Sequence, residues 1–561
     1  MKRALLIAIA ALTVQTAVAQ DFNPTYLSVI GSRTAKFNYI TKDKTFYRDS
    51  VYMITGITTV KGNATLTIEA GTLIVGDTAA NQRGVLIISR EGKINAVGKV
   101  DDPIIFTSLK AKGKRQIGDW GGIIIFGKAP FNQAPGTKYE GGVLEDPSSP
   151  TDQQWGGSEA NHNSGSLAYA RIEFAGFPFA PNREVNSLTM GGVGNGTRID
   201  HIQVSYGGDD SYEWFGGTNN LKYLIAYNGV DDDFDVDFGY SGKVQFGVAI
   251  RNPNIADASQ SNGFEVDNDG TGTGATPFTS GVFSNITMVG PMQNSSTPIN
   301  SLFGRAGHLR RNNSLRIFNS LFMGWRTGVQ IDGTGAAAQA NAPGGLIFAN
   351  NITQSYPAAG KMNTYFDTIG VRGTLNPMTY FAANNNTKID EVADAGLTDP
   401  FNASKPNVTP KSNSPLASGG LFTNNLLTDA FFTSVTYRGA VDPNRNWFNE
   451  KWVNFDPINT EYKEGKARTF VNITAIARPV TEVSIYPNPA ANQTTFQFST
   501  DVTKQLDVKV LDITGKVVAN VANASFNGGS NQININTENL NNGMYFIQVN
   551  GAASGKFTVV K

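Results

Sequence analysis

Short apolar runs separated by glycine, asparagine or aspartate recur along the chain from about residue 50 onward. The runs at 73–75, 85–88, 104–106 and 123–126 consist of Ile, Val, Leu and Phe, and related runs return roughly every 20–30 residues. A period of that length with two or three short strands per turn is typical of a β-solenoid, because a single coil cannot bury its own inner face and stacked coils share one apolar interior. An array of β-sandwiches is the alternative. It would need frequent tight hairpin turns, and the sequence offers few of them.

Three segments carry a family resemblance within this pattern: Ile68–Thr72, Pro103–Ser108 and Asp119–Ile124. They resemble secreted right-handed parallel β-helix proteins of the pectate-lyase-like class, over roughly residues 25–455. The resemblance implies an all-β fold with a β-helix domain at 20–457. The tryptophan-containing stretch 442–457 is interpreted as a cap, because a solenoid must cover its last coil.

The end of the chain has a different pattern, with strands of alternating polarity from about residue 480. This pattern predicts a small antiparallel, immunoglobulin-like β-sandwich of about seven strands at 480–561, after a linker at 458–479. Its motifs resemble the type A C-terminal sorting domain of type IX secretion, and an ordinary carbohydrate-binding or immunoglobulin-like module is the alternative. The motif residues are Pro487, Asn488, Pro489, Gly515, Gly543, Tyr545 and Lys561.

That resemblance implies export across the outer membrane by the type IX secretion machinery, followed by removal of the domain and surface attachment or release. The start of the chain agrees with this route. Lys2 and Arg3 precede an apolar run at 4–12, and a small-x-small site predicts signal-peptide cleavage between Ala19 and Gln20, so that 1–19 is the signal peptide. We expect a protein secreted through the periplasm of a Gram-negative bacterium to the cell surface or medium. No later run reaches the roughly 18 apolar residues of a transmembrane segment.

Composition narrows the function. The 561 residues include 46 Lys+Arg and 46 Asp+Glu, no Cys and 3 His. The lack of cysteine excludes disulfides, thiolate metal sites, a cysteine nucleophile and a lipoprotein anchor. Zero net charge argues against a nucleic-acid partner, and three histidines leave little room for a multi-histidine metal centre.

Carboxylates are concentrated between residues 209 and 270, in three stretches that align on one another. Strand alternation places Tyr212, Phe234, Phe264 and Val329 in one column that faces the core, and the residue after each of them on the outer face. Stacked coils would bring the outer carboxylates to about 5 Å from one another. We call this set the acidic ladder: Asp209, Asp210, Glu213, Asp231, Asp232, Asp233, Asp235, Asp237, Glu265, Asp267 and Asp269.

Like charges at that spacing repel, and Ca²⁺, which takes roughly six to eight oxygen ligands, would neutralise them in a secreted protein. The acidic ladder therefore predicts a calcium site. A solvated acidic face or a ladder of Asn and Asp side chains at the turns is the alternative.

A basic stretch follows the acidic ladder and contains Arg305, His308, Arg310 and Arg311. If the coils bring it to the carboxylates, it predicts either a cleft for an acidic ligand, since arginine suits carboxylate and phosphate groups, or structural ion pairs with the acidic ladder. In pectate-lyase-like enzymes an arginine can act as a base, but no catalytic pattern of that family matches here residue by residue.

These features favour a surface or secreted protein that binds a glycan or a partner at the outer membrane. A polysaccharide lyase or glycoside hydrolase acting on acidic glycans is the enzymatic alternative, and a purely structural surface protein is the third. The catalytic residues and the identity of the ligand remain open at this level.

Overall fold

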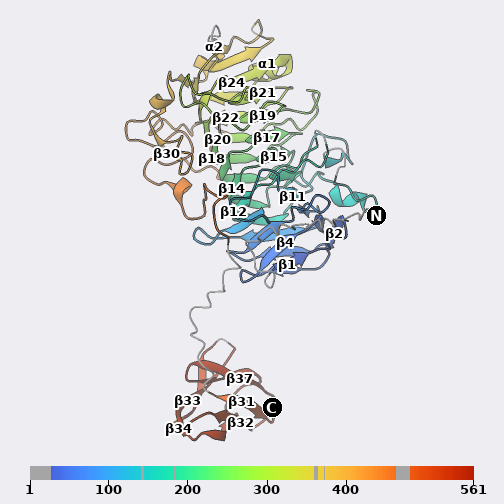
Figure 1. The fold of residues 1–561 in the computed structure, drawn as a ribbon, viewed down its shortest axis with the longest axis vertical. Coiled ribbons are helices and arrows are strands. Elements are labelled where there is room, and N and C mark those ends of the chain that lie inside the picture. The colour runs from blue at the N-terminus through green and yellow to red at the C-terminus, as the bar shows by residue number, and fades with distance from the viewer. Residues whose placement is uncertain are drawn as a thin grey trace, which may run out of the picture. The chain divides into compact units, whose positions relative to one another are not determined.

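The structure is a computed structural model that describes residues 27–139, 144–180, 183–358, 364–371, 373–462, 480–513 and 515–561. The chain divides into two compact units, Met1–Ala467 and Arg468–Lys561 (Figure 1). The expected signal peptide with its cleavage site, and residues 463–479 of the linker expected at 458–479, lie outside the described residues.

The first unit is a parallel β-helix built from two long sheets, in which almost every strand pairs in parallel with its equivalent in the next coil. Sheet A has 17 strands and sheet B has 11. Sheet B consists of β2 (Phe37–Ile40), β5 (Ile57–Val60), β8 (Val85–Ile88), β11 (Gly122–Phe126), β13 (Leu188–Gly191), β15 (Tyr212–Phe215), β17 (Phe234–Asp237), β19 (Phe264–Val266), β21 (Gly307–Leu309), β24 (Val329–Asp332) and β27 (Phe366–Ile369).

Sheet A forms two faces of the coil. Its strands are β1 (Leu27–Ile30), β3 (Lys44–Phe46), β4 (Val51–Ile54), β6 (Thr65–Ile68), β7 (Leu73–Gly76), β9 (Lys93–Val97), β10 (Ile104–Ser108), β12 (Gly165–Glu173), β14 (Arg198–Ser205), β16 (Asn220–Tyr227), β18 (Lys243–Ile250), β20 (Val282–Val289), β22 (Arg316–Phe318), β23 (Leu321–Trp325), β25 (Ile347–Ala349), β26 (Ile352–Ser355) and β28 (Thr387–Lys388). The two halves of β12 pair with different strands, β9 and β10, so the long strands cross a corner of the coil.

A column of left-handed residues makes that corner. Equivalent positions of successive coils have positive φ angles, a conformation that lets the strand bend and that Asn adopts most easily among residues with a Cβ. The column runs through Tyr169, His201, Tyr223, Phe246, Asn285, Asn319 and Asn350. The rings in its first part stack on one another, with 4.1 Å between the centroids of Tyr169 and His201.

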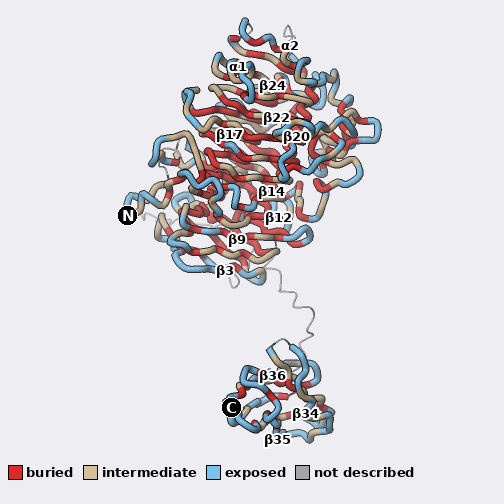
Figure 2. The backbone as a smooth tube through the Cα atoms, turned by 180° about the vertical axis from the view of Figure 1, so that it is seen from behind, coloured by how far each residue is buried: buried red, intermediate tan, exposed pale blue. Residues whose placement is uncertain are grey.

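The interior of the coil is apolar and filled. Ile, Val, Leu and Phe from all faces form one continuous core, and the coil strands are largely buried (Figure 2). Tyr212, Phe234 and Phe264 lie in register in this core, as the sequence predicts. Trp214 is fully buried beside them.

Two segments cover the outside of the coil. The insertion 127–164, which contains the 3-10 helix η3 (Pro150–Gln153), packs Tyr139, Leu144 and Trp155 on the apolar outer face of sheet B from β5 to β15. Beyond that stretch the outer face of sheet B becomes acidic. The second segment is the return segment, residues 396–462, which contains β29 (Leu397–Asp399), β30 (Asn407–Pro410) and the 3-10 helix η5 (Trp447–Asn449).

The interpretation of residues 442–457 as a cap is wrong. Trp447, Phe448, Trp452 and Phe455 pack against the outer apolar face of sheet A, on strands such as β16 and β18. The side-chain amide of Gln245 exchanges two hydrogen bonds of 2.8 Å with the backbone of Thr433. The return segment thus runs along the side of the β-helix.

Helix α2 (Pro377–Ala383) covers the last coil instead. Its Tyr380 and Phe381 lie against Phe366 of β27. The Asn376 side chain caps the start of the helix by accepting hydrogen bonds from two backbone amides. Two further elements lie at this end of the unit, α1 (Gly333–Asn341) and the 3-10 helix η4 (Val392–Ala395).

The second unit is a β-sandwich of two antiparallel sheets with its own core, as predicted. One sheet has the order β31-β32-β35 and the other β34-β33-β36-β37. The strands are β31 (Thr481–Tyr486), β32 (Gln493–Thr500), β33 (Lys504–Leu511), β34 (Val517–Phe526), β35 (Gly529–Asn536), β36 (Gly543–Val549) and β37 (Ala552–Val559).

Candidate functional site

The acidic ladder lies on sheet B from β15 to β19, at the turns that precede β15 and β17, and at the turn that follows β19. Glu213, Asp235 and Glu265 occupy directly paired positions of three successive strands. Carboxylate oxygens come within 4.8 Å of one another in three overlapping triads. The triads are Asp209/Asp210/Asp231, Asp210/Glu213/Asp235 and Asp232/Asp235/Glu265.

A ladder of Asn and Asp side chains at the turns, the alternative that the sequence left open, is present and orients these carboxylates. We call it the corner ladder: Asn186, Asp210, Asp232 and Asn262, each two residues before a strand of sheet B. Each side chain accepts a hydrogen bond from the backbone N–H at the same position of the next coil. These distances are 3.1 Å from Asp210 N to Asn186, 2.9 Å from Asp232 N to Asp210, and 3.0 Å from Arg305 N to Asn262, and the Asn262 N–H donates to Asp232.

The corner ladder shows that the structural role of these side chains does not depend on their charge. Asn186 and Asn262 do the same work at its two ends with neutral amides, so the backbone does not require the charge of Asp210 or Asp232. The sequence signal was visible, because an Asn or Asp recurs two residues before the strand in four coils. It becomes meaningful only once the strand starts are known.

The carboxylates of the acidic ladder sit in an environment that opposes their charge. Burial raises the pKa of Asp210, Asp232 and Asp235 well above the usual range, and repulsion from neighbouring carboxylates raises each further. Burial also raises the pKa of Asp231 to about 6 and, together with repulsion from Asp267, raises that of Asp237. Within the part of the chain that the structure describes, no group donates a hydrogen bond to the Asp235 carboxylate, although it belongs to two triads.

Other predicted ligands have different partners. Asp233 forms a buried ion pair with Arg251, at 3.0 Å between Arg251 Nε and Asp233 Oδ2, and burial raises its pKa to about 7. Asp269 accepts hydrogen bonds from the backbone N–H groups of Thr271 and Thr273 and so closes its own loop. Both residues lie outside the three triads.

The basic stretch meets the far end of the acidic ladder. Arg310 binds Asp267 with both Nε and Nη2, at 2.8 and 3.1 Å, and also contacts Glu265. Arg311 Nη1 lies 2.7 Å from Asp267 Oδ2. Burial raises the pKa of Asp267 to about 7, although Arg311 lowers it in part. Two guanidinium groups therefore already neutralise this end.

His308 and Arg305 belong to a coil that was not expected from the sequence, where Val329 follows Phe264 in the core column. β21 lies between β19 and β24, so His308 stands in the carboxylate column between Glu265 and Gln330. Its Nε2 lies 2.8 Å from Asp332 Oδ2, and burial followed by the charge of Arg305 lowers its pKa. Arg305 donates to the side chains of Gln260 and Gln330. The coil was overlooked because its strand carries no carboxylate.

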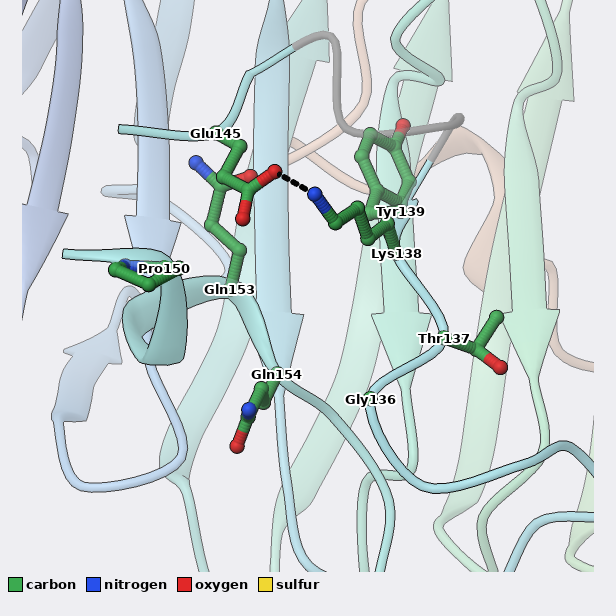
Figure 3. Close-up of a pocket in the computed structure, with 8 residues that line it drawn as sticks. All are labelled: Gly136, Thr137, Lys138, Tyr139, Glu145, Pro150, Gln153 and Gln154. Carbon is green, nitrogen blue, oxygen red and sulfur yellow. Dashed lines mark hydrogen bonds and ion pairs between the residues drawn. The ribbon is translucent and has the colours of Figure 1, made fainter. Parts of the chain in front are cut away.

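A pocket of about 240 Å³ lies elsewhere, in the insertion 127–164 (Figure 3). Lys138 and Glu145 form an ion pair at its wall, and Tyr139 and Gln153 also line it. None of its lining residues belongs to the acidic ladder.

In the second unit, the motif residues hold the strand ends together. Asn488 accepts a hydrogen bond from Thr558 N at 2.9 Å, the carbonyl of Pro487 accepts one from Thr494, and Lys561 N donates to Asn542 at 2.9 Å. The further motif residues Pro489, Gly515, Gly543 and Tyr545 lie beside these contacts or in the turns and strand starts of the same sandwich.

With this geometry in place, comparison with known families identifies both units. The stacked parallel coils define the class of β-helix proteins, and a family model described as a pectate-lyase-like β-helix domain matches residues 38–396. The chain belongs to this family. Residues 484–561 match a secretion system C-terminal sorting domain, which confirms the export address. No curated protein matches the chain.

The sorting domain implies the type IX secretion machinery as a partner and a secreted protein at the cell surface or outside the cell. Among the described residues, no helix is long and apolar enough to cross a membrane.

Proposed function

We propose that this secreted β-helix protein binds a glycan or a surface partner, and that Ca²⁺ held by the acidic ladder stabilises or completes the binding face. The observation that carries the calcium proposal is that the corner ladder has Asp at two of its positions and Asn at the other two. Two coils place carboxylates where an amide would serve the backbone equally well, and those carboxylates face Glu213 and Asp235.

A bound divalent cation would compensate these negative charges. Hard oxygen ligands in an irregular cluster suit Ca²⁺, which tolerates variable geometry at roughly 2.3–2.6 Å. The end of the acidic ladder near Asp210 and Asp235 has the carboxylate triads, whereas the end near Asp267 is served by Arg310 and Arg311. The cation therefore belongs at the first end.

A binding role is favoured over a lyase because the basic residues are engaged. Arg310 and Arg311 are ion-paired to the acidic ladder, whereas an arginine acting as a base has to be free to take a proton. Asp209, Asp231 and Asp235 are partly exposed, so a bound cation could also contact a carboxylate of an acidic glycan.

The test is calcium-dependent thermal melting of residues 20–561, which keep the sorting domain, with the double variant Asp210→Asn/Asp232→Asn. This variant keeps the side-chain oxygens that accept the backbone N–H groups of the corner ladder and removes two charges. We expect Ca²⁺ to raise the melting temperature of the wild type and to leave that of the variant nearly unchanged. Asp390→Asn, an exposed carboxylate outside the acidic ladder, is the matched control.

The absence of any calcium shift in the wild type would refute the metal proposal. A panel of acidic glycans, tested with and without Ca²⁺, addresses the ligand. Cleavage of a glycan that is lost in Asp235→Ala would replace the binding role with an enzymatic one.

A further inference from the structure

The sorting domain exposes apolar side chains on one end of one sheet. Along β33 and β36, buried residues such as Val510 and Ile547 alternate with residues on the outer face of the sheet. Strand pairing puts Val517, Leu511 and Phe546 side by side on that outer face. Met544, two residues before Phe546, is 45% exposed, and Ile513 in the adjacent turn is 75% exposed. We call these five residues the apolar row.

The apolar row is confined to that end. The next outer row along the same strands is polar and consists of Asn520, Lys509 and Gln548. Within it Lys509 pairs with Asp507 at 2.7 Å. A cluster of exposed apolar side chains on a small domain with an otherwise polar face marks a contact surface.

The motif residues determine the structure of this end, but their hydrogen-bonding groups already have partners within the domain. Asn488 holds the β37 backbone at Thr558, opposite Met544, and Gly543 pairs with Val559. Lys561 donates through its backbone to Asn542 and through its ammonium group to the Glu538 carbonyl. The motif residues therefore fix the positions of β36 and β37, and with them the place of the apolar row on the outer face of the sheet.

The charged residues at the edge of the apolar row indicate which kind of partner surface would fit it. Lys556 is directly paired with Phe546 across the strands, and Lys516 precedes Val517. Asp512, which accepts a hydrogen bond from the Lys516 backbone N–H at 3.1 Å, lies at the same edge, so the two lysines leave an excess of positive charge there. Complementary potentials set the specificity of protein interfaces, so the fitting partner presents an apolar patch with acidic groups at its edge.

We propose that the apolar row is the surface through which this sorting domain docks onto a protein component of the type IX secretion machinery, which carries a matching apolar patch with an acidic rim. The proposal rests on the sorting role of the domain and is independent of the calcium proposal.

The test is export of the full chain in a bacterium that has a type IX system. The variant Ile513→Ser/Val517→Ser/Met544→Ser removes three exposed side chains of the row. We expect secretion to fall about tenfold and the precursor to accumulate in the periplasm, because the three substitutions remove apolar surface that the docked interface would bury. Val483→Ser/Val502→Ser, two exposed apolar residues outside the row, is the matched control and should be exported normally.

A second variant, Lys516→Glu/Lys556→Glu, reverses the rim and leaves the sandwich core untouched, and it should also reduce export. Normal export of both variants would overturn the proposal. Dissociation of a dimer by the serine variant, seen by light scattering while export is unchanged, would assign the row to a second copy and overturn it as well. Calcium-dependent melting should be the same in all these variants, so failure here is distinct from failure of the metal site.

Discussion

Asp210 and Asp232 perform two tasks with one side chain. One oxygen of each accepts a backbone N–H of the next coil, a task that Asn186 and Asn262 perform without charge. The remaining negative charge is unfavourable in a buried position unless a cation compensates it. Asp235, which accepts no hydrogen bond from the described residues, joins two of the triads and is the most informative position to change.

Replacement of Asp235 by Asn should have opposite effects with and without calcium. In chelator at pH 8, removal of a carboxylate whose pKa is raised by burial and by repulsion from Asp237 should increase the melting temperature, by about 2 °C. In saturating Ca²⁺ the variant should melt below the wild type, since it lacks a ligand of two triads. Differential scanning calorimetry measures both. The same change of sign in Asp390→Asn would contradict a local effect.

The stability of the calcium-free protein should fall as the pH rises. An Asp with a raised folded-state pKa binds more protons folded than unfolded, so its contribution is lost between its ordinary pKa and its folded one. For Asp231, Asp233 and Asp267 this window runs from about pH 4 to pH 6–7. Arg251, Arg310 and Arg311 face these groups and reduce the slope without reversing it.

Urea unfolding between pH 4.5 and pH 8 measures this dependence, and Ca²⁺ should flatten it because only the ionised carboxylates bind the metal. Calcium at about 100 times its Kd would add about 2.7 kcal/mol at the upper end of the range. A profile that rises with pH in chelator would contradict the assignment of raised pKa values.

At the scale of elements, the return segment provides a second core outside the coil. Its aromatic residues pack on sheet A, and its end is fixed where Tyr462 donates to the buried Glu173 at 2.6 and 2.8 Å. Arg115 donates to the carbonyls of Pro457 and Thr460 beside it. The β-helix unit therefore includes Tyr462, five residues beyond its expected end at 457.

The substitution Tyr462→Phe should loosen this attachment. It leaves the Glu173 carboxylate buried without its phenol donor, which costs about 1–3 kcal/mol. We expect a lower unfolding midpoint of the β-helix unit in urea and faster proteolysis within the return segment. Tyr486→Phe in the sorting domain removes an exposed hydroxyl and should change neither. Equal resistance of Tyr462→Phe and the wild type to protease would contradict the role of Tyr462 in attaching the return segment.

At the scale of the whole molecule, two units with separate cores carry separate tasks. All three triads belong to the β-helix unit. Calorimetry of the full chain should therefore resolve two transitions, of which only the β-helix transition moves with Ca²⁺. A calcium shift of the sorting-domain transition, or one shared transition, would contradict this division.

Much of the fold was accessible from the sequence because it depends on local periodicity. Alternation along a strand predicts the core column of Tyr212, Phe234 and Phe264, and the motifs near Pro487 and Gly543 identify the sorting domain. Two expectations failed for one reason. The place of the His308 coil and the position of Trp447 both depend on which segments stack on one another. Neither segment carries a repeated sequence pattern that would indicate the strand it packs against.

The sequence by itself determined the class of fold, the export address and the concentration of carboxylates, since each depends on residue type and spacing along the chain. Only the tertiary structure decided which carboxylates share a site. Stacking placed Asp210, Glu213 and Asp235 together, gave Asp233 to Arg251 and Asp267 to Arg310, and left Asp235 without a donor among the described residues. The physical reason is that electrostatic partners are set by distances between coils, and those distances depend on loop lengths and burial rather than on position in the chain.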